Sequence, residues 1–330
     1  MSFDALIPYG WNERWAALAA ELPAAVEPAR VVRHDGVALQ VATVEGLRMA
    51  PLAQRLDPAP TVGDWVVLDG AHPVAVLDRS SLLSRRAALG GATQVLAANV
   101  ELVLLVCGLD RPVKDGRIQR GAALARDAGA VPVVVLTKAA VVDPDLPERA
   151  ARQVGRDHPG LQVVVTSARE GTGLAEVRRL LAGRTTVLIG ESGAGKSSLV
   201  NAVARHDLAA VGRVRTGDAK GRHTTTNRHL HLVPGGGTII DTPGIRSIGL
   251  VVDPDAVDAT FTDIEDLAAD CRFGDCAHDT EPGCAVNLAV IEGRLDRHRL
   301  DAWHELRREA EAAVRRPSPQ ERRRRGRPGR

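Results

Sequence analysis

The residues from Gly190 to Ser197 have the composition and spacing of a loop that binds phosphate groups. They read Gly-Glu-Ser-Gly-Ala-Gly-Lys-Ser, follow an apolar run at 186–189 and precede a helix-like run at 198–203, which is the context this pattern requires. Glycines let backbone N–H groups surround the phosphates, Lys196 neutralises the charge of the β- and γ-phosphates, and the Ser197 hydroxyl is a ligand for Mg²⁺. The predicted phosphate contacts are Gly190, Glu191, Ser192, Gly193, Ala194, Gly195, Lys196, Ser197 and Ser198.

A second group of polar residues completes the Mg²⁺ chemistry of that loop. Asp241-Thr-Pro-Gly244 follows the apolar run 237–240, so Asp241 is expected at the carboxyl end of a strand, beside the phosphate crevice. We expect Asp241 to hold Mg²⁺ through water and the Gly244 N–H to meet the γ-phosphate. A hydroxyl-rich segment at 221–226 lies between the motifs, where a switch loop supplies a threonine to Mg²⁺. Thr225 or Thr226 is the expected ligand, and an ordinary threonine-rich loop is the alternative.

Hydrolysis also requires a group that orients the attacking water. Ile245 follows Gly244, so this position offers no side-chain amide of the kind that orients water in Ras-like enzymes. His223 is the nearest titratable residue, and a neutral imidazole accepts a proton from water at about pH 7. We therefore name His223 as the candidate catalytic residue. The alternative is a structural or RNA-facing loop residue.

Two candidate base-contacting motifs precede the phosphate loop along the chain. Thr137-Lys138 follows one apolar run, and Thr166-Ser167-Ala168 follows another. In most GTPases the phosphate loop comes first and the base-reading motif last. The order in this chain therefore predicts a circularly permuted GTPase domain. The predicted base contacts are Thr137, Lys138, Ala139, Ala140, Ser167 and Ala168.

Three of the four cysteines, together with one histidine, lie close together near the end of the chain. Cys271, Cys276, His278 and Cys284 are spaced C-x4-C-x-H-x5-C, and three thiolates with one imidazole form a closed tetrahedral site for structural zinc. A chance cluster of reduced cysteines is the alternative. Cys107 lies alone in an apolar run and is expected to be a packing residue.

Together these motifs resemble the ribosome-small-subunit-dependent GTPase A family, also called RsgA or YjeQ. The resemblance rests on the phosphate loop extended to Asn201, the segment Gly-Arg-His-Thr-Thr-Thr at 221–226, Asp-Thr-Pro-Gly-Ile-Arg at 241–246 and the cysteine cluster. It covers about residues 5–314. It implies an N-terminal OB-fold domain, a circularly permuted GTPase domain and a C-terminal zinc domain. The implied function is late maturation of the small (30S) ribosomal subunit, with hydrolysis of GTP to GDP and phosphate that the subunit stimulates.

This chain departs from the family in its base reader. Members carry Asn or Thr, then Lys, any residue and Asp, whereas this chain ends the motif with Ala140. That aspartate accepts hydrogen bonds from guanine N1–H and the 2-amino group, so its loss costs about 1.5 to 3 kcal/mol, or tenfold to more than a hundredfold in affinity. Asp143 is an alternative acceptor if the loop repositions. Lys138 still stacks its stem along the base, and the Ala168 N–H still meets guanine O6.

Ala140 leaves two other functions open. One is a protein that binds rRNA or the ribosome and has weak nucleotide binding with little turnover. The other is an enzyme that accepts ATP or several nucleotides. Asp110 and Arg111 are expected in a loop at a strand end, and we assign no chemistry to them.

The periodicity of the chain predicts a multidomain α/β protein. Alternating runs with Gly and Pro turns near the N-terminus favour a small β-barrel with Trp65 in its core, and near-continuous apolar runs favour a mostly parallel sheet. A long helix is expected at 287–314. The predicted strands of the sheet are 102–106, 131–136, 163–165, 187–189 and 238–240, with helices at 118–128 and 174–181. The predicted domains are a helical extension at 1–29, an OB-fold domain at 30–90, the permuted GTPase domain at 91–250, a helical zinc domain at 251–314 and a basic disordered tail at 315–330.

Composition excludes several other classes of protein. Hydrophobic residues make up 44% and charged residues 25% of the chain, as in a soluble globular protein, while 2% aromatic content argues against base stacking on single-stranded nucleic acid. No apolar run reaches the length of about 18 residues that a membrane helix needs. We expect a cytoplasmic monomer with no membrane partner. The tail at 315–330 carries a net charge of +7, whereas the whole chain carries +2. A basic tail on an acidic body suits contact with rRNA phosphates.

Overall fold

The centre of the computed structural model is a parallel sheet that places the candidate site residues at its carboxyl edge. The structure describes residues 2–23, 25–86, 93–204, 228–241 and 254–315. Five parallel strands lie in the order β10, β9, β8, β11 and β13, and β12 joins β13 in the antiparallel sense. The predictions of a mostly parallel sheet and of its five apolar strands are confirmed. These strands are β8 (Leu102–Gly108), β9 (Val131–Thr137), β10 (Gln162–Val165), β11 (Thr185–Ile189) and β13 (Thr238–Asp241), followed at the edge by β12 (His229–Leu232).

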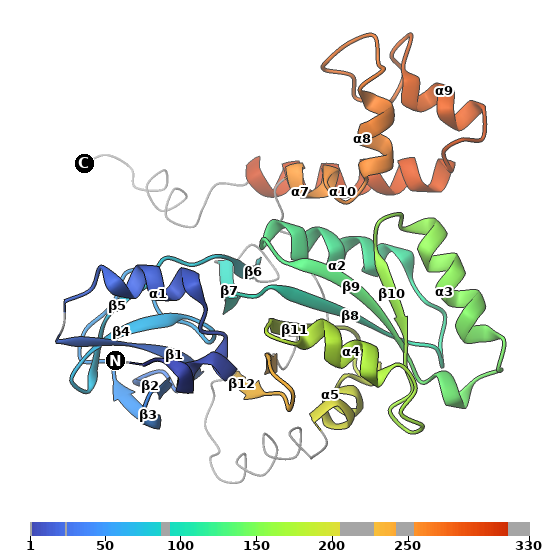
Figure 1. Cartoon of the computed structure of the whole chain (residues 1–330). Helices are drawn as coiled ribbons and strands as arrows, with labels where there is room; N and C mark the ends of the chain where they lie inside the picture. The colour runs from blue at the N-terminus through green and yellow to red at the C-terminus, as the bar shows by residue number, and fades with distance from the viewer. Residues whose placement is uncertain (1, 24, 87–92, 205–227, 242–253, 316–330) are drawn as a thin grey trace, which may run out of the picture.

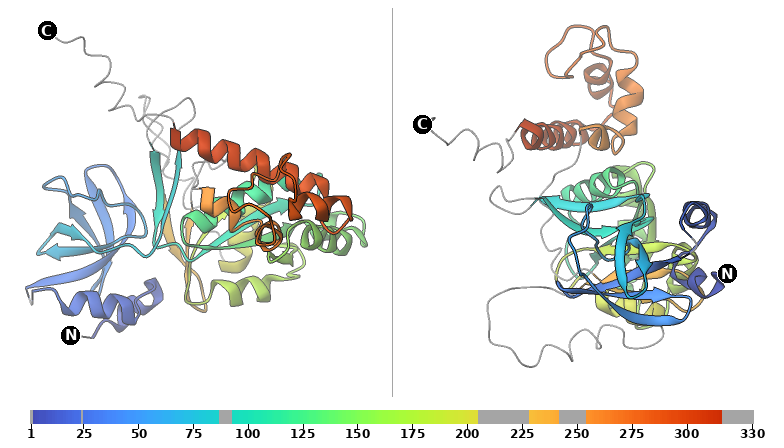
Figure 2. Two further views of the ribbon diagram at one scale, coloured as in Figure 1. Left: turned by 90° about the horizontal axis from the view of Figure 1, so that it is seen from above. Right: turned by 90° about the vertical axis from the view of Figure 1, so that its left-hand side faces the viewer.

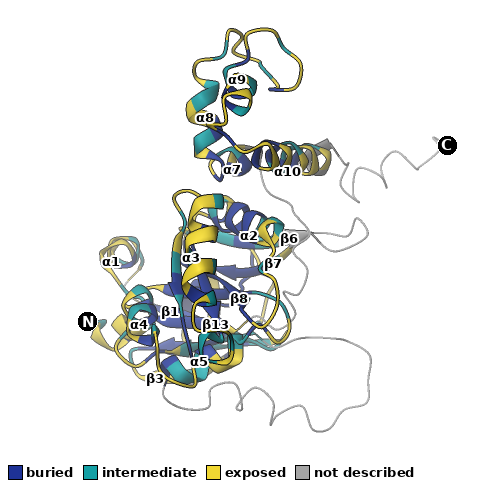
Figure 3. Cartoon of the chain, turned by 90° about the vertical axis from the view of Figure 1, so that its right-hand side faces the viewer, coloured by how far each residue is buried: buried dark blue, intermediate teal, exposed yellow. Residues whose placement is uncertain are grey.

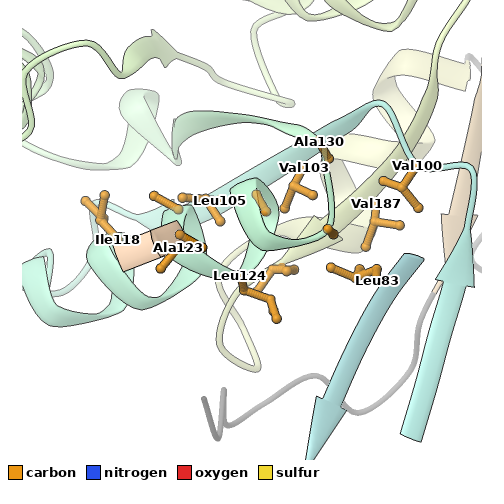
Figure 4. Close-up of a cluster of buried hydrophobic side chains, with 14 of the residues drawn as sticks. Leu83, Val100, Val103, Leu105, Ile118, Ala123, Leu124, Ala130 and Val187 are labelled. Atoms are coloured by element: carbon orange, nitrogen blue, oxygen red, sulfur yellow. The ribbon is translucent and has the colours of Figure 1, made fainter. Parts of the chain in front are cut away.

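Alternating side chains of β8 enter two separate cores, one on each face of the sheet. Val103 and Leu105 pack in the core that includes Ile118 of α2, while Leu104 packs in the core that includes Val177 of α4. Figure 1 shows α2 and α3 on one face and α4 and α5 on the other, and Figure 4 shows Val103 and Leu105 beside α2. Burial on both faces explains why these strands are almost continuously apolar. The covering helices are α2 (Asp115–Asp127), α3 (Leu146–Asp157), α4 (Leu174–Leu181) and α5 (Lys196–Ala204).

The N-terminal strands form an antiparallel unit that is continuous with the central sheet. Strand β1 pairs with β2, with β4 and, among the described residues, through Arg33↔His229 with β12. His229 in turn pairs with Asp241 of β13, on the other side of β12. Buried Arg30 also crosses the junction, where it donates to Thr185 Oγ1 at 3.0 Å and lies over the Trp65 ring. The strands of this unit are β1 (Val26–His34), β2 (Ala38–Thr43), β3 (Gly46–Pro51), β4 (Trp65–Asp69) and β5 (His72–Val76).

The first helical segments pack against this unit and are shorter than the predicted extension. Trp65 is fully buried, as expected, with the Trp11 and Trp15 rings 4.9 and 5.8 Å away. Strand β1 begins at Val26, inside the segment 1–29 that was predicted as helical. The OB-fold remains a prediction. The extension contains a 3-10 helix η1 (Asp4–Tyr9) and α1 (Glu13–Ala20), and the antiparallel pair β6 (Leu82–Arg86) and β7 (Thr93–Ala98) precedes the central sheet in the chain.

The C-terminal residues form a helical unit over α2 (Figures 1 and 2). The predicted single helix at 287–314 is wrong, because the chain breaks between α9 and α10. Gly293 has φ +73°, a left-handed conformation that suits glycine at a helix end, and Asp296 Oδ1 accepts from the His298 N–H at 2.7 Å as α10 begins. Figure 3 shows the exposed outer face of α3 below this unit. The unit comprises α7 (Pro254–Asp258), α8 (Thr262–Ala268), α9 (Ala285–Ile291) and α10 (Arg297–Arg315).

One hydrogen bond from Arg299 and the ion pairs of Arg120 join α10 to the helices that cover the central sheet. Arg299 is almost buried and donates to Asp263 at 2.5 and 2.6 Å and to the Asp157 carbonyl at 3.0 Å. Arg120 of α2 donates to Glu305 and Glu309 at 2.8 and 2.9 Å. The C-terminal helix is therefore held against both α2 and the end of α3.

Candidate nucleotide site and metal centre

The phosphate loop lies between β11 and α5, as its sequence context predicts. Lys196 begins α5 and folds back over the loop, where its Nζ donates to the Gly190 and Glu191 carbonyls at 2.5 and 2.7 Å. Gly193 and Gly195 have φ +77° and +93°, which side chains other than glycine rarely adopt. Glycines in this conformation let the backbone turn its N–H groups toward a ligand, and Lys196 adds a cation at the loop, which suits a polyphosphate.

Close packing explains why Gly190 cannot carry a side chain. A Cβ atom at this position would come within 2.3 Å of the Val106 carbonyl on the neighbouring strand β8. A Cβ at Gly195 would meet the Thr137 hydroxyl at 3.0 Å. The phosphate loop is therefore pressed against the ends of β8 and β9.

Thr137 joins the predicted base reader to the phosphate loop. Its Oγ1 donates to the Ala194 carbonyl at 2.5 Å, and the side chain is buried. Two segments that are far apart in the sequence are thus fixed together at the carboxyl edge of the sheet. This geometry assembles one continuous site from both motifs.

A cavity of about 890 Å³ opens beside this contact and has the size of a nucleoside site. Lys138 follows β9 with φ +66° and extends its ammonium to Asp110 Oδ2 at 2.7 Å. Asp110 also accepts from Arg111 at 3.2 Å, and the hydrogen bond from Lys138, followed by that from Arg111, lowers the pKa of Asp110 to about 2. The described residues around the cavity include Asp110, Thr137, Lys138, Val141, Thr166, Ser167, Ala168, Arg169, Gly195, Ser198, Leu199, Asn201 and Ala202.

Ala140, which replaces the base-reading aspartate, and Asp143, the alternative acceptor, both lie outside this lining. Ala140 is half-buried in the 3-10 turn η2 (Ala139–Val141), directly after Lys138. Asp143 Oδ1 accepts from the Asp145 N–H at 2.9 Å, in the turn that leads into α3. Neither residue contributes to the described lining of the cavity.

A smaller cavity of about 50 Å³ lies on the other side of the phosphate loop. Lys196, Ser197 and Asp241 line it together, as the Mg²⁺ prediction requires, and His231 of β12 joins them. Partial desolvation raises the pKa of Asp241, and the nearby Lys196 and His229 oppose this effect. A further cation beside Asp241 would favour the ionised carboxylate.

The predicted switch residues lie outside the described part of the chain. These are the candidate catalytic residue His223, the magnesium candidates Thr225 and Thr226, and Gly244.

The cysteine cluster forms a metal-binding geometry in the loop between α8 and α9. The donor atoms of Cys271, Cys276, His278 and Cys284 all lie within 4.8 Å of one another. His278 Nδ1 is 3.6 Å from Cys271 Sγ and 3.5 Å from Cys284 Sγ. Desolvation and the neighbouring Cys284 and Cys271 thiols raise the pKa of Cys276 to about 11, so three thiolates at this spacing require a cation. The cluster can therefore bind a metal ion.

Elements around the cluster hold its donors in place. Cys284 caps α9 through a contact from the Asn287 N–H to its Sγ at 3.4 Å, and the Asn287 amide donates to the His278 carbonyl at 3.2 Å. The Trp303 ring of α10 lies 5.3 Å from the His278 ring. The other cysteine, Cys107, lies in β8, and burial raises its pKa to about 11, as expected of a packing thiol.

Asp110 and His231 are among the lining residues that the sequence did not assign to the site. Asp110 was assigned no chemistry, although a polar residue just after a buried parallel strand is a signal of site placement. His231 lies within β12, where nothing in the sequence separated it from an ordinary strand residue.

No helix in the described ranges has the length and apolar content to span a membrane.

The strand order and the position of the phosphate loop define the class of protein. Base-site strands β9 and β10 precede the phosphate-loop strand β11 in the chain, yet all lie in one parallel sheet. Two solved structures share this fold. YjeQ from Thermotoga maritima is 26% identical, with a TM-score of 0.65, and the match covers 88% of this chain and 100% of that one. YloQ, described as a circularly permuted GTPase, is 22% identical, with a TM-score of 0.65, and the match covers 88% of this chain and 96% of that one. The chain has the circularly permuted GTPase fold.

Sequence comparison then defines the family. Residues 76–251 match the model of the RsgA GTPase family. A protein of Streptomyces coelicolor named small ribosomal subunit biogenesis GTPase RsgA is 42% identical over 325 residues, which cover 94% of this chain and 88% of that protein. The chain belongs to the RsgA GTPase family.

Proposed function

We propose that this protein hydrolyses GTP to GDP and phosphate and assists late maturation of the small ribosomal subunit. One observation carries the proposal: Lys196, Ser197 and Asp241 line one cavity, in a chain that is 42% identical to a protein named for GTPase activity and small-subunit biogenesis. The cavity accounts for the phosphate chemistry, and the relationship accounts for the partner.

Each residue of the smaller cavity has its own part in binding the phosphates or Mg²⁺. Lys196 exchanges the Gly190 and Glu191 carbonyls for the β- and γ-phosphates, and the loop N–H groups surround their oxygens. The Ser197 hydroxyl and the Asp241 carboxylate are hard oxygen donors, which suit Mg²⁺. When bound, Mg²⁺ supplies charge stabilisation for the transferred phosphoryl group. Thr225, Gly244 and the water-orienting His223 complete this proposal from the switch segments.

The base end of the site is proposed to hold guanine with reduced selectivity. Ser167 and Ala168 lie in the wall of the large cavity and suit contact with guanine O6, while Lys138 covers the ring. Ala140 offers no acceptor to guanine N1–H or the 2-amino group. We therefore expect GTP to be preferred over ATP less strongly than in members with an aspartate at this position.

The metal of the cysteine cluster is proposed to be a structural zinc ion. Three thiolates and one imidazole are the soft and borderline donors that zinc prefers, with metal–ligand distances of about 2.0 to 2.3 Å. All four positions are filled by protein, which leaves none for water. The ion would therefore stabilise the C-terminal unit and take no part in hydrolysis.

The partner is proposed to be the small ribosomal subunit, bound through its rRNA. An OB-fold N-terminal domain, spanning 30–90, and the basic tail at 315–330 are the proposed contacts with rRNA phosphates. The predicted limits of the GTPase domain at 91–250 and of the zinc domain at 251–314 stand as part of this proposal. We expect a cytoplasmic protein that acts as a monomer.

The test is phosphate release with GTP, ATP and XTP, each with and without small ribosomal subunits. We expect slow GTP turnover by the protein alone and faster turnover with small subunits, and no stimulation by large subunits. An Asp241→Asn variant serves as the blank for contaminating phosphatases. Absence of turnover with every nucleotide in the presence of small subunits would refute the proposal. Equal turnover of GTP, ATP and XTP would refute the preference for guanine but not the hydrolysis.

A further inference from the structure

The ion pair between Asp110 and Lys138 gives the base cavity a feature that the family motifs do not describe. The two residues follow adjacent parallel strands, β8 and β9, whose last residues Gly108 and Thr137 are paired. The carboxylate and the ammonium are 2.7 Å apart, and both residues line the large cavity. The pair therefore forms part of the wall of the space proposed for the base.

The backbone of Lys138 shows that its direction is held by its surroundings. Its φ of +66° is in the left-handed region, where residues other than glycine are uncommon. Such conformations persist where the surrounding structure fixes them, and they are concentrated at functional sites. Here Thr137, the residue before Lys138, is hydrogen-bonded through its hydroxyl to the Ala194 carbonyl. Asp110 holds the ammonium at the end of the Lys138 side chain.

Asp110 is already committed to cations and is poorly suited to read the base itself. Among the described residues that line the large cavity, Asp110 is the only carboxylate. Its Oδ2 atom accepts from both Lys138 and Arg111. An acceptor for guanine N–H groups would have to leave these two partners.

We propose, on the basis of the proposed nucleotide-binding function, that Asp110 is a positioning residue that holds the stem of Lys138 over one face of a purine base. Lysine stems cover apolar surface while the ammonium stays solvated or paired. Such a contact depends on the ring and not on its hydrogen-bonding edge. In this chain it supplies base affinity that does not depend on residue 140 and is shared by guanine, hypoxanthine and adenine.

The test compares Asp110→Asn with the wild type by calorimetric titration of GTP, ITP, ATP and inorganic triphosphate. Loss of the carboxylate charge releases Lys138, so the affinity for all three nucleotides should fall by the same factor, about fivefold to tenfold. Binding of inorganic triphosphate, which has no base, should not change. Asp110→Glu should restore part of the nucleotide affinity.

A double-mutant cycle separates positioning from a general structural role. In a Lys138→Ala background, the Asp110→Asn substitution should have no further effect on nucleotide affinity. Glu148→Gln is the matched control, since it removes an exposed ion pair with Arg152 at 3.0 Å, on α3 and outside the cavity. Thermal unfolding of each variant checks that the fold is kept.

Three results would overturn the inference. A loss for GTP that exceeds the loss for ITP would make Asp110 a direct reader of the 2-amino group. A parallel loss for inorganic triphosphate would place its effect on the phosphate loop, and additive effects in the cycle would remove the link to Lys138. A wild-type protein that binds none of the nucleotides would instead refute the proposed function.

Discussion

The metal cluster and the nucleotide site are built in opposite ways. All four donors of the cluster lie within residues 271–284, and one loop between two helices brings them together. The nucleotide site draws on the ends of β8, β9, β10, β11 and β13, which span residues 108–241 and meet only because the strands are parallel. A local site depends on the spacing of its residues, whereas an assembled site depends on the whole sheet.

This difference determines how each site responds to the loss of one residue. A closed tetrahedral site has no substitute for a missing ligand, so each donor is essential. The nucleotide site has separate ends for phosphate and base, so Ala140 weakens one end while the other remains intact.

Cys276→Ser should abolish metal binding by the cluster and unfold the C-terminal unit around it. A structural zinc site contributes about 10 to 16 kcal/mol of apparent binding free energy that is coupled to folding. We expect loss of about one equivalent of bound metal and lower helical content by circular dichroism. Cys107→Ser is the control and should retain the metal, because its thiol lies in β8. Full metal content in the Cys276 variant would contradict the closed site.

Lys196→Ala should weaken binding of every nucleotide by about a hundredfold, because it removes the cation that faces the phosphates. Titration with GTP, ATP and inorganic triphosphate should give the same factor for each ligand. The bound metal of the cluster should stay unchanged. Arg179→Ala, an exposed cation on α4, is the control. A loss confined to one base would show that the two ends of the site are not separable.

Ala140→Asp should raise the preference for GTP over ATP by tenfold to more than a hundredfold. The new carboxylate can accept from guanine N1–H and the 2-amino group, which adenine cannot satisfy, and such charge-assisted contacts contribute about 1.5 to 3 kcal/mol. Competition binding measures the ratio. Ala139→Asp places the same charge one residue earlier and should leave the ratio near that of the wild type. An unchanged ratio with Ala140→Asp would refute our interpretation of the base reader.

Arg120→Ala should have the smallest effect, a loss of about 0.2 to 1 kcal/mol in the free energy of unfolding. Its partners Glu305 and Glu309 are largely exposed, and exposed ion pairs contribute little because water and salt screen them. Chemical denaturation measures the loss, and Arg152→Ala on α3 is a matched exposed pair. A loss of several kcal/mol would mean that the two regions are joined more strongly than their contacts indicate.

Local patterns predicted most of the central fold. The strands and the helices at 118–128 and 174–181 lie close to their expected limits. The strands were predictable because a strand that is buried on both faces of a sheet is almost continuously apolar. The long helix at 287–314 was wrong, since its apolar periodicity continues past Gly293 and gives little sign of the break. The close spacing of the four metal donors was readable because it is set within fourteen residues.

Contacts between strands were harder to predict than the strands themselves. The ion pair of Asp110 with Lys138 and the bond from Thr137 to Ala194 depend on which strands are neighbours in the sheet. No spacing within one segment contains that information. The switch residues fall outside the described part of the chain, so the predictions for His223, Thr225, Thr226 and Gly244 stay as they were made.

The contact between β1 and β12 places the N-terminal strands close to the proposed magnesium residue. Arg33 pairs with His229 and His229 pairs with Asp241, and the buried Arg30 side chain bonds to Thr185 across the same junction. Asp241 therefore lies about two strand spacings, or 9 to 10 Å, from β1. We expect a displacement of β1 to reach Asp241 through these two strand pairs, without passing through any helix.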